Sequence, residues 1–306
     1  MKLITIIIPL FNSEKYVINT LNSLRNQTYK IWECIVIDDD SEDHSYEIVK
    51  QIVDTEPRIR LVKRKNYSTK KGANTCRNIG LSLAKTLYIM FIDADDHLEP
   101  FCLEERINII LKNKTFDFYI FRTGFIDQKD NIIGDFRNET DNFMEIIINF
   151  IGHKIPWHTM SLVWEIQFLL RLGGWNEEYE RLQDVELNIR ALLKKPKVYF
   201  SQISVDSYYR IYAISLQKQR ASQKAFCRLI NDFYHPLISD KSITYPLKSK
   251  LVDIFQEQMN FLLRNYLVDI DYIDREFEYL YLKVIKNIGL DVGEKKFVKQ
   301  LFIKFK

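Results

Sequence analysis

The sequence lacks three features that would point to particular classes of protein. Its net charge is only +3, from 44 basic and 41 acidic residues, which is too small to predict nucleic-acid binding. Its four cysteines are far apart and form no CxxC pair, so neither a zinc site nor a disulfide scaffold is indicated. No apolar run approaches the roughly 20 residues that a membrane span needs. We therefore expect reduced thiols, a cytoplasmic protein and at most peripheral contact with the inner face of a membrane.

The chain does contain ample material for a core. Hydrophobic residues make up 46% of the 306 residues, with 20 Phe and 17 Tyr among them, and this excludes intrinsic disorder as the main theme. The length suits one large α/β domain with an appendage, or two modest domains.

Apolar strand-like segments alternate with amphipathic helical ones through the first half of the chain. Strands are expected at residues 3–8, 32–37, 59–62, 88–92 and 116–121. Helices are expected to begin at Ser13 and Glu14, after a cap at Ser41, and over residues 73–84. This alternation predicts a mostly parallel sheet with helices on both faces.

After about residue 131 the alternation stops. Residues 130–131 are expected to turn a hairpin, residues 184–193 to form an amphipathic helix, and residues 198–200 and 207–212 to form short strands. Beyond residue 215 the pattern is helical and charged, which predicts a boundary near residues 215–220.

Two of the expected strands end in aspartate-rich turns. Asp38, Asp39 and Asp40 follow one strand, and residues 93–96 (Asp-Ala-Asp-Asp) follow another. Ligands of parallel α/β sheets bind at the carboxyl ends of the strands. Clustered carboxylates repel one another unless a cation or hydrogen-bond donors satisfy them. Two such clusters on one sheet therefore favour a metal–phosphate site.

Several linked motifs resemble those of family-2 glycosyltransferases, in the same order along the chain. The resemblance covers residues 3 to about 215 and includes Pro9-Leu10-Phe11-Asn12, Val36-Ile37-Asp38-Asp39, Arg77-Asn78-Ile79-Gly80, Phe91 to Asp96, Gly173-Gly174-Trp175, Gln183-Asp184 and Tyr208-Tyr209-Arg210. It implies a GT-A (Rossmann-like) α/β domain over residues 1–215, with a nucleotide-sugar half to about 125 and an acceptor half over 126–215. Residues 216–306 would form a helical C-terminal extension.

The resemblance implies a metal site in the second acidic cluster. Asp95 would bind Mn²⁺ or Mg²⁺ directly, and Asp93 would contact the ribose or a metal-bound water, with Ala94 between them. Divalent cations of this kind prefer oxygen ligands and neutralise a departing diphosphate.

The same resemblance places the nucleotide near the first strand. Asp39 would accept a hydrogen bond from the uracil ring, with Pro9 and Phe11 close by. Asp40 stands where the family usually has glycine, which makes the nucleotide preference less secure than the fold. Arg77 would lie near the diphosphate or support its loop, and an ordinary surface arginine is the simpler alternative.

Asp184 is the candidate catalytic base. Displacement at the anomeric carbon requires the acceptor hydroxyl to lose its proton, and a carboxylate at a helix start can accept it. The family usually has Glu-Asp where this chain has Gln183-Asp184, and a helix N-cap is the structural alternative. Trp175 is the candidate acceptor contact, because aromatic faces stack on sugar rings.

These expectations together describe an inverting, metal-dependent hexosyl- or N-acetylhexosaminyltransferase that uses a nucleotide-sugar, with UDP favoured. The resemblance implies a glycan or lipid-linked oligosaccharide acceptor, in surface polysaccharide or lipopolysaccharide synthesis. A non-catalytic nucleotide- or glycan-binding member of the fold stays open as an alternative. A sugar nucleotidyltransferase is disfavoured because residues 9–14 contain neither glycine nor arginine.

The C-terminal third admits two kinds of contact. Lysines and aromatic residues interleave over residues 295–306, a pattern that suits either an anionic lipid surface or a terminal helix docked on the body. Residues 251–267 are amphipathic and could form a homodimer face.

Overall fold

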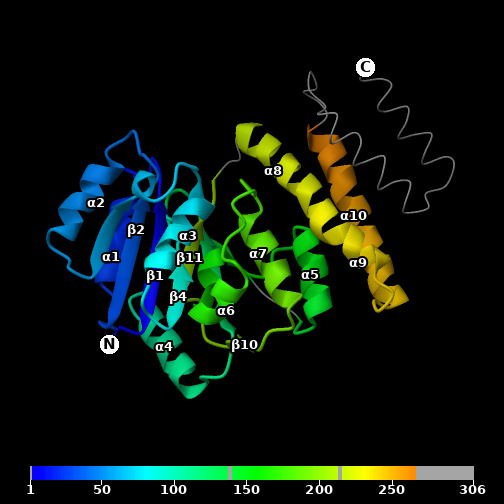
Figure 1. Cartoon of the computed structure of the whole chain (residues 1–306), viewed down its shortest axis with the longest axis horizontal. Coiled ribbons are helices and arrows are strands. Elements are labelled where there is room, and N and C mark those ends of the chain that lie inside the picture. The colour runs from blue at the N-terminus through cyan, green and yellow to red at the C-terminus, as the bar shows by residue number, and fades with distance from the viewer. Residues whose placement is uncertain (1, 137–139, 213–215, 267–306) are drawn as a thin grey trace. The chain divides into compact units, whose positions relative to one another are not determined.

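The computed structural model describes residues 2–136, 140–212 and 216–266, and the chain divides into two compact units (Figure 1). The first unit comprises Met1–Ile146 and Ile155–Ala213, and the second comprises Ile147–Lys154 and Ile214–Lys306. The domain boundaries expected from the sequence stay a prediction.

The first unit is built on a seven-stranded sheet in the order β10-β6-β9-β4-β1-β2-β3. All neighbouring strands are parallel except β9, which lies antiparallel between β4 and β6. The strands are β1 (Ile4–Leu10), β2 (Trp32–Asp38), β3 (Ile59–Lys63), β4 (Tyr88–Phe91), β6 (Phe118–Ile120), β9 (Leu162–Glu165) and β10 (Val198–Phe200). The mostly parallel sheet expected from the sequence is confirmed.

Helices cover both faces of this sheet, because successive residues of the buried strand β1 point to opposite sides. Ile4, Ile6 and Ile8 share one core with apolar residues of α1, α2 and α4. On the other face Gly80 of α3 lies so close to Ile7 that an added Cβ would come within 2.4 Å of its Cγ2. The helices of this unit are α1 (Val17–Arg25), α2 (Ser45–Val53), α3 (Ala73–Leu83), α4 (Cys102–Lys112), α6 (Ile166–Arg171) and α7 (Gln183–Leu192), with short 3-10 turns η1 (Arg64–Asn66) and η2 (Thr159–Ser161).

A smaller four-stranded sheet, in the order β5-β11-β7-β8, completes the first unit. Its strands are β5 (His97–Leu98), β7 (Thr123–Ile126), β8 (Ile132–Asp135) and β11 (Ser207–Arg210). β7 and β8 form the hairpin expected at residues 130–131, and Asp130 takes a positive φ of 66° in its turn. β5 directly follows the second acidic cluster, and β11 pairs with it. Residues 207–210 therefore lie close to that cluster although they are distant from it in sequence.

Two expected helix starts are wrong. α1 begins at Val17, because the backbone N–H groups of Tyr16 and Val17 close a turn on the Ser13 carbonyl instead. α2 begins at Ser45, so Ser41 is not its cap, and the Ser41 hydroxyl accepts a hydrogen bond from the backbone of Asn12.

The second unit is helical in its described part. Its helices are α8 (Leu216–Leu229), the π-helical turn η3 (Ile230–Tyr234), α9 (His235–Ser239) and α10 (Tyr245–Tyr266), while α5 (Phe143–Ile151) runs into it from the first unit. An added Cβ at Gly152 would lie 2.5 Å from the Ile254 side chain, which places residues 147–154 tightly against α10. Leu251 and Ile254, in the segment considered as a homodimer face, are already buried within the chain. No described helix is both long and apolar enough to cross a membrane. The basic, aromatic segment 295–306 lies outside the described residues.

Candidate active site

Acidic side chains gather where two parallel strands of the main sheet end. Asp38 is the last residue of β2, and Asp39 and Asp40 follow it. Residues 93–96 follow β4, and only β1 separates the two strands. The two clusters therefore lie at the same edge of one sheet, where ligands of parallel α/β sheets bind.

Arg77 joins the second cluster to the start of α7. Its side chain is 5% exposed, so it is not a surface arginine. Nη2 donates to Oδ1 of Asp93 at 2.7 Å, and Nη1 donates to Oε1 of Gln183 at 2.9 Å and to Oδ1 of Asn74 at 3.2 Å. Burial by itself would raise the pKa of Asp93, but the Arg77 guanidinium holds it below the usual range. Asp93 therefore stays ionised at this position.

Asp95 and Asp96 experience the opposite effect. Burial, followed by the negative charge of Asp93, raises the pKa of Asp95 to about 6. Burial and the charges of both neighbouring aspartates raise the pKa of Asp96 well above its usual range. The carboxylate of Asp96 accepts hydrogen bonds from the backbone N–H groups of Asp93 (3.2 Å) and Arg210 (3.4 Å), so it shapes the turn. For Asp95, the Tyr212 hydroxyl and the charge of Arg210 only partly offset burial and the charge of Asp93, and a bound cation would relieve that environment.

Arg210 of β11 also holds the acidic turn at residues 93–96 in place. Its Nε donates to the carbonyl of Asp95 at 3.2 Å, Nη1 to the carbonyl of Asp127 at 3.0 Å, and Nη2 to Oδ1 of Asp130 at 2.6 Å. The guanidinium also lies 4.8 Å from the ring centre of Tyr16. The strand expected from the sequence around Tyr208, Tyr209 and Arg210 is confirmed, and it also reaches the acidic turn.

Asp184 lies in the first turn of α7, and its position differs from the expected cap. The helix begins at Gln183 after Leu182, which takes the left-handed conformation, and Oδ1 of Asp184 accepts from the backbone N–H of Val185 at 3.0 Å. The N-cap alternative for Asp184 is therefore wrong. Its side chain is half-buried and its carboxylate stays partly accessible.

His158 and Tyr209 lie within the electrostatic reach of both candidate sites. Their rings stack with centres 4.0 Å apart. Burial lowers the pKa of His158, although the charges of Asp184 and Asp93 act in the opposite direction. Burial raises the pKa of the Tyr209 hydroxyl, and the charges of Asp96, Asp93, Asp95 and Asp184 add to this increase. The candidate base and the acidic turn therefore influence the same two rings.

The first cluster is held by an arginine that the sequence analysis did not single out. Arg64 of η1 is 2% exposed and forms ion pairs with both Asp39 and Asp40. Asp39 also accepts a hydrogen bond from the backbone N–H of Gly72 at 2.8 Å. Asp40 has a φ of 60°, the left-handed conformation that favours glycine and that aspartate tolerates better than most residues. The turn is thus kept although the usual glycine is absent.

The remaining candidates of the nucleotide side differ in exposure. Pro9, near the end of β1, is half-buried and lies opposite Ile37 of β2. Phe11, just beyond that strand, has half of its surface exposed. Ala94 is buried between Asp93 and Asp95.

Trp175 is enclosed rather than presented to a ligand. Its side chain is 3% exposed, the Arg77 guanidinium lies 4.5 Å from its ring centre, and Phe91 contacts it edge to face with centres 5.1 Å apart. The indole ring therefore packs against both Arg77 and Phe91. A ring enclosed in this way has little face left to stack on an acceptor sugar.

The donor set fits a divalent cation held mainly by its substrate. Among the residues that the structure describes, no three His, Cys, Asp or Glu side chains are arranged to bind a metal by themselves. Asp95, with Asp93 beside it, supplies carboxylate oxygens. Mg²⁺-type sites in nucleotide enzymes commonly use one or two carboxylates together with substrate phosphates.

Comparisons with known proteins show which family the chain belongs to. The family model of glycosyl transferase family 2 matches residues 5–166, more than half of the chain. This chain belongs to glycosyl transferase family 2. The family, the GT-A fold class and the enzyme class, glycosyltransferase, were all expected from the sequence and are confirmed.

Two curated relatives of this family differ in how much they share with the chain. An uncharacterized glycosyltransferase of Haemophilus influenzae is 41% identical over 113 residues, which span 37% of this chain and 44% of that relative. A UDP-Glc:α-D-GlcNAc-diphosphoundecaprenol β-1,3-glucosyltransferase of Escherichia coli, WfaP, is 29% identical over 78% of this chain and 94% of its own length.

Two solved structures show the fold alone, because their sequence identities are low. Residues 1–349 of Staphylococcus aureus TarS in complex with UDP superpose with a TM-score of 0.63, at 16% identity, over 94% of this chain and 80% of that chain. A Pyrobaculum calidifontis mannosyltransferase in complex with GDP-Man and Mn²⁺ gives a TM-score of 0.54, at 14% identity, over 97% and 83%.

Proposed function

We propose that this family-2 glycosyltransferase transfers a sugar from a UDP-sugar to a hydroxyl group of a glycan or lipid-linked acceptor, with inversion at the anomeric carbon. The observation that carries the proposal is the position of Arg77. One buried guanidinium contacts Asp93 of the acidic turn and Gln183, the neighbour of Asp184. The same side chain therefore links the candidate donor site to the start of the helix that carries the candidate base.

Asp184 would receive the proton of the acceptor hydroxyl. The acceptor oxygen then forms a bond to the anomeric carbon while the bond from that carbon to the diphosphate oxygen breaks, and UDP leaves with the electron pair. A single displacement of this kind inverts the centre. Because the carboxylate of Asp184 is half-buried on a helix start, it can remain fixed while staying within reach of an entering hydroxyl.

The acidic turn would hold the diphosphate end of the donor. Mn²⁺ or Mg²⁺ bound there would offset the charge that develops on the leaving diphosphate. Asp95 would be the principal ligand, because Arg77 already occupies Oδ1 of Asp93. The donor site would also be lined by Asp93, Ala94 and Arg77.

The uracil ring would lie between the first cluster and the end of β1. Asp39 has an oxygen that accepts from Gly72 and another paired with Arg64, and a carboxylate has further lone pairs for a ring N–H. Pro9 and the exposed Phe11 would flank the ring. Support for UDP comes from two comparisons, the WfaP relative, whose name includes UDP-Glc, and the TarS complex, which contains UDP.

Nucleotide-dependent thermal stability tests the donor site. A ligand at ~100 times its dissociation constant should stabilise the protein by about 2.7 kcal/mol. We expect UDP to raise Tm more than GDP, CDP or TDP, and only with Mn²⁺ present. Asp95→Asn should abolish this shift, whereas Asp54→Asn, an exposed aspartate after α2, should keep it.

Hydrolysis of UDP-sugars tests catalysis separately. Asp184→Asn should retain the UDP shift while losing about 10²–10⁴-fold in rate, the usual contribution of a general base. Wild-type protein that binds UDP with Mn²⁺ but neither hydrolyses nor transfers any UDP-sugar would support the non-catalytic alternative instead. The anomeric configuration of the product, read by NMR, decides between inversion and retention.

A further inference from the structure

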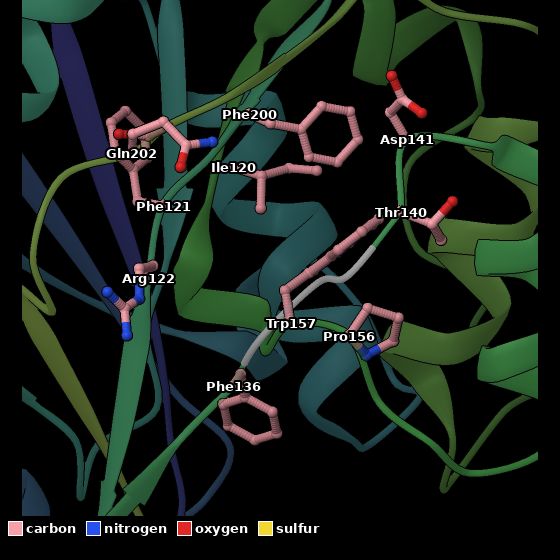
Figure 2. A pocket seen from close by; sticks show the side chains of 11 residues that line it. Ile120, Phe121, Arg122, Phe136, Thr140, Asp141, Pro156, Trp157, Phe200 and Gln202 are labelled. Atoms are coloured by element: carbon pink, nitrogen blue, oxygen red, sulfur yellow. The ribbon is translucent and has the colours of Figure 1, made fainter.

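A cavity of about 890 Å³ opens beside the carboxyl ends of β6 and β10 (Figure 2). Its volume lies in the range of small-molecule sites. The described residues that line it come from the ends of these strands and from positions 136, 140–141 and 156–157: Ile120, Phe121, Arg122, Phe136, Thr140, Asp141, Pro156, Trp157, Phe200, Ser201 and Gln202. β6 and β10 are parallel, so the cavity lies at the ligand-binding edge of the main sheet.

The lining combines ring faces with hydrogen-bonding groups. Phe200 and Ile120 project into the space opposite Thr140 and Asp141 (Figure 2). Phe136 and Phe200 are half-buried, which leaves ring surface for a ligand, and Gln202 and Asp141 are exposed. A pyranose has apolar C–H faces that pack on aromatic rings and hydroxyl groups that both donate and accept hydrogen bonds. This lining matches both properties.

The charge of the cavity favours a neutral occupant. Arg122 is its only Lys or Arg among the described lining residues, and its guanidinium is already paired with Asp135. Asp141 adds a negative charge. A diphosphate or a carboxylate would therefore gain little here, whereas an uncharged sugar avoids the cost of burying an unpaired charge.

The wall of the cavity is connected to the candidate base by two hydrogen bonds. The indole Nε1 of Trp157 donates to Oδ1 of Asn188 at 3.0 Å, and Nδ2 of Asn188 donates to the backbone carbonyl of Asp184 at 2.8 Å. His158, the next residue along the chain, lies within electrostatic reach of Asp184 and Asp93. A ligand that contacts Trp157 is therefore linked through Asn188 to the helix α7 that carries Asp184.

We propose that this cavity binds a neutral pyranose unit of the acceptor glycan and sets which acceptor is used. The inference rests on the proposed function, because an acceptor is required only if a sugar is transferred. Phe200 would pack on the apolar face of the ring, and Gln202 and Asp141 would bond its hydroxyls. The Trp157–Asn188 contact would hold that wall in place relative to Asp184.

Binding of simple glycosides to the full chain tests this proposal. The probes are p-nitrophenyl α- and β-glycosides of glucose, galactose, mannose, N-acetylglucosamine and rhamnose, added at millimolar concentration with UDP and Mn²⁺. Saturation-transfer NMR identifies the binders, and titration gives their affinity. Gln202→Ala and Phe200→Leu should each weaken binding about five- to tenfold, the equivalent of one lost hydrogen bond or ring contact. Gln51→Ala, an exposed glutamine on α2, is the matched control and should bind as wild type does.

The UDP-dependent rise in Tm separates this proposal from the proposed function. Retention of that rise in both cavity variants, together with weaker glycoside binding, supports the acceptor assignment. The assignment is wrong if UDP stabilises the protein but no glycoside binds, or if glycosides bind equally to wild type and both variants. Binding of inorganic pyrophosphate that Arg122→Gln abolishes would also overturn it, because the cavity would then be an anion site. Loss of the UDP effect in wild type itself would refute the proposed function instead.

Discussion

Arg106 and Asp206 form a two-pronged ion pair in which both side chains are fully buried. Nε donates to Oδ2 at 2.7 Å and Nη2 to Oδ1 at 2.5 Å. The rest of the guanidinium is satisfied by the carbonyl of Met160 at 2.7 Å and the hydroxyl of Ser207 at 3.0 Å. Asp206 directly precedes β11, so the pair joins α4 to the start of the strand that brings Tyr209 and Arg210 to the acidic turn.

Removal of one member of this pair should be costly. We expect Asp206→Asn to lower the free energy of unfolding by about 3–5 kcal/mol, because the Arg106 charge stays buried without its partner. Urea unfolding followed by circular dichroism measures the change. Glu56→Gln breaks the more accessible pair with Arg58 and should cost about 1 kcal/mol or less. Equal losses in the two variants would contradict this account.

Asp40 allows the backbone and the ion pair to be separated. Asp40→Gly and Asp40→Ala both remove the contact with Arg64, but only glycine adopts a φ of 60° without a Cβ penalty. We expect the alanine variant to be about 1–2 kcal/mol less stable than the glycine variant. Urea unfolding of the two proteins side by side gives the difference directly, and identical stabilities would refute a left-handed residue 40.

Gly80 should respond to substitution in the opposite way from an ordinary helix glycine. In an exposed helix, replacing glycine by alanine stabilises by up to about 1 kcal/mol. Here a Cβ would lie 2.4 Å from Cγ2 of Ile7 and 3.0 Å from Cδ1 of Ile37. We expect Gly80→Ala to destabilise by about 1–3 kcal/mol. The double variant Ile7→Ala/Gly80→Ala should lose less than the sum of the two single changes, and strict additivity in denaturant unfolding would argue against the contact.

His158 should make stability depend on pH in the mildly acidic range. Its pKa is lowered by burial, so on acidification the unfolded chain binds a proton before the folded chain does. The contribution of His158 is complete above the unfolded pKa of about 6.5 and is lost as the pH falls below it. Between about pH 7.5 and about pH 5.5, wild type should lose more unfolding free energy than His158→Gln, by at most about 1.4 kcal/mol per pH unit.

His44 supplies a control of opposite sign for the pH experiment. A hydrogen bond with Glu14 raises the pKa of His44, so its favourable contribution grows as the pH falls and is lost as the pH rises through the folded pKa. His44→Gln should therefore lose more stability than wild type on acidification. The same pH slope in wild type and in His158→Gln would show that His158 does not titrate differently in the folded protein.

The framework of the molecule was predictable from the sequence because its signals are local. Strand β2 followed by three aspartates and strand β4 followed by residues 93–96 are contiguous patterns, and the parallel topology places their ends together. The hairpin at Asp130 and the helix that carries Asp184 were predictable for the same reason.

Partnerships between distant residues were not predictable, since no local pattern encodes them. Arg64 lies in a run of basic residues that looks exposed, yet it is buried against Asp39 and Asp40. Trp175 looks like a sugar-stacking residue until Arg77 and Phe91 are found on it. The sequence predicted the start of α7 at the wrong residue, because Leu182 adopts a left-handed conformation that its apolar side chain does not indicate.

The separation of 100 residues between Arg106 and Asp206 has a consequence for how the chain acquires its shape during translation. The ribosome delivers α4 many seconds before it delivers β11, at a rate of roughly 5–20 residues per second. Throughout that interval the guanidinium of Arg106 has no carboxylate to meet, and the interior around it cannot close. The acidic turn, which needs Arg210 of the same strand, is assembled last. A nascent chain therefore becomes competent to bind its donor only after nearly the whole first unit has been made.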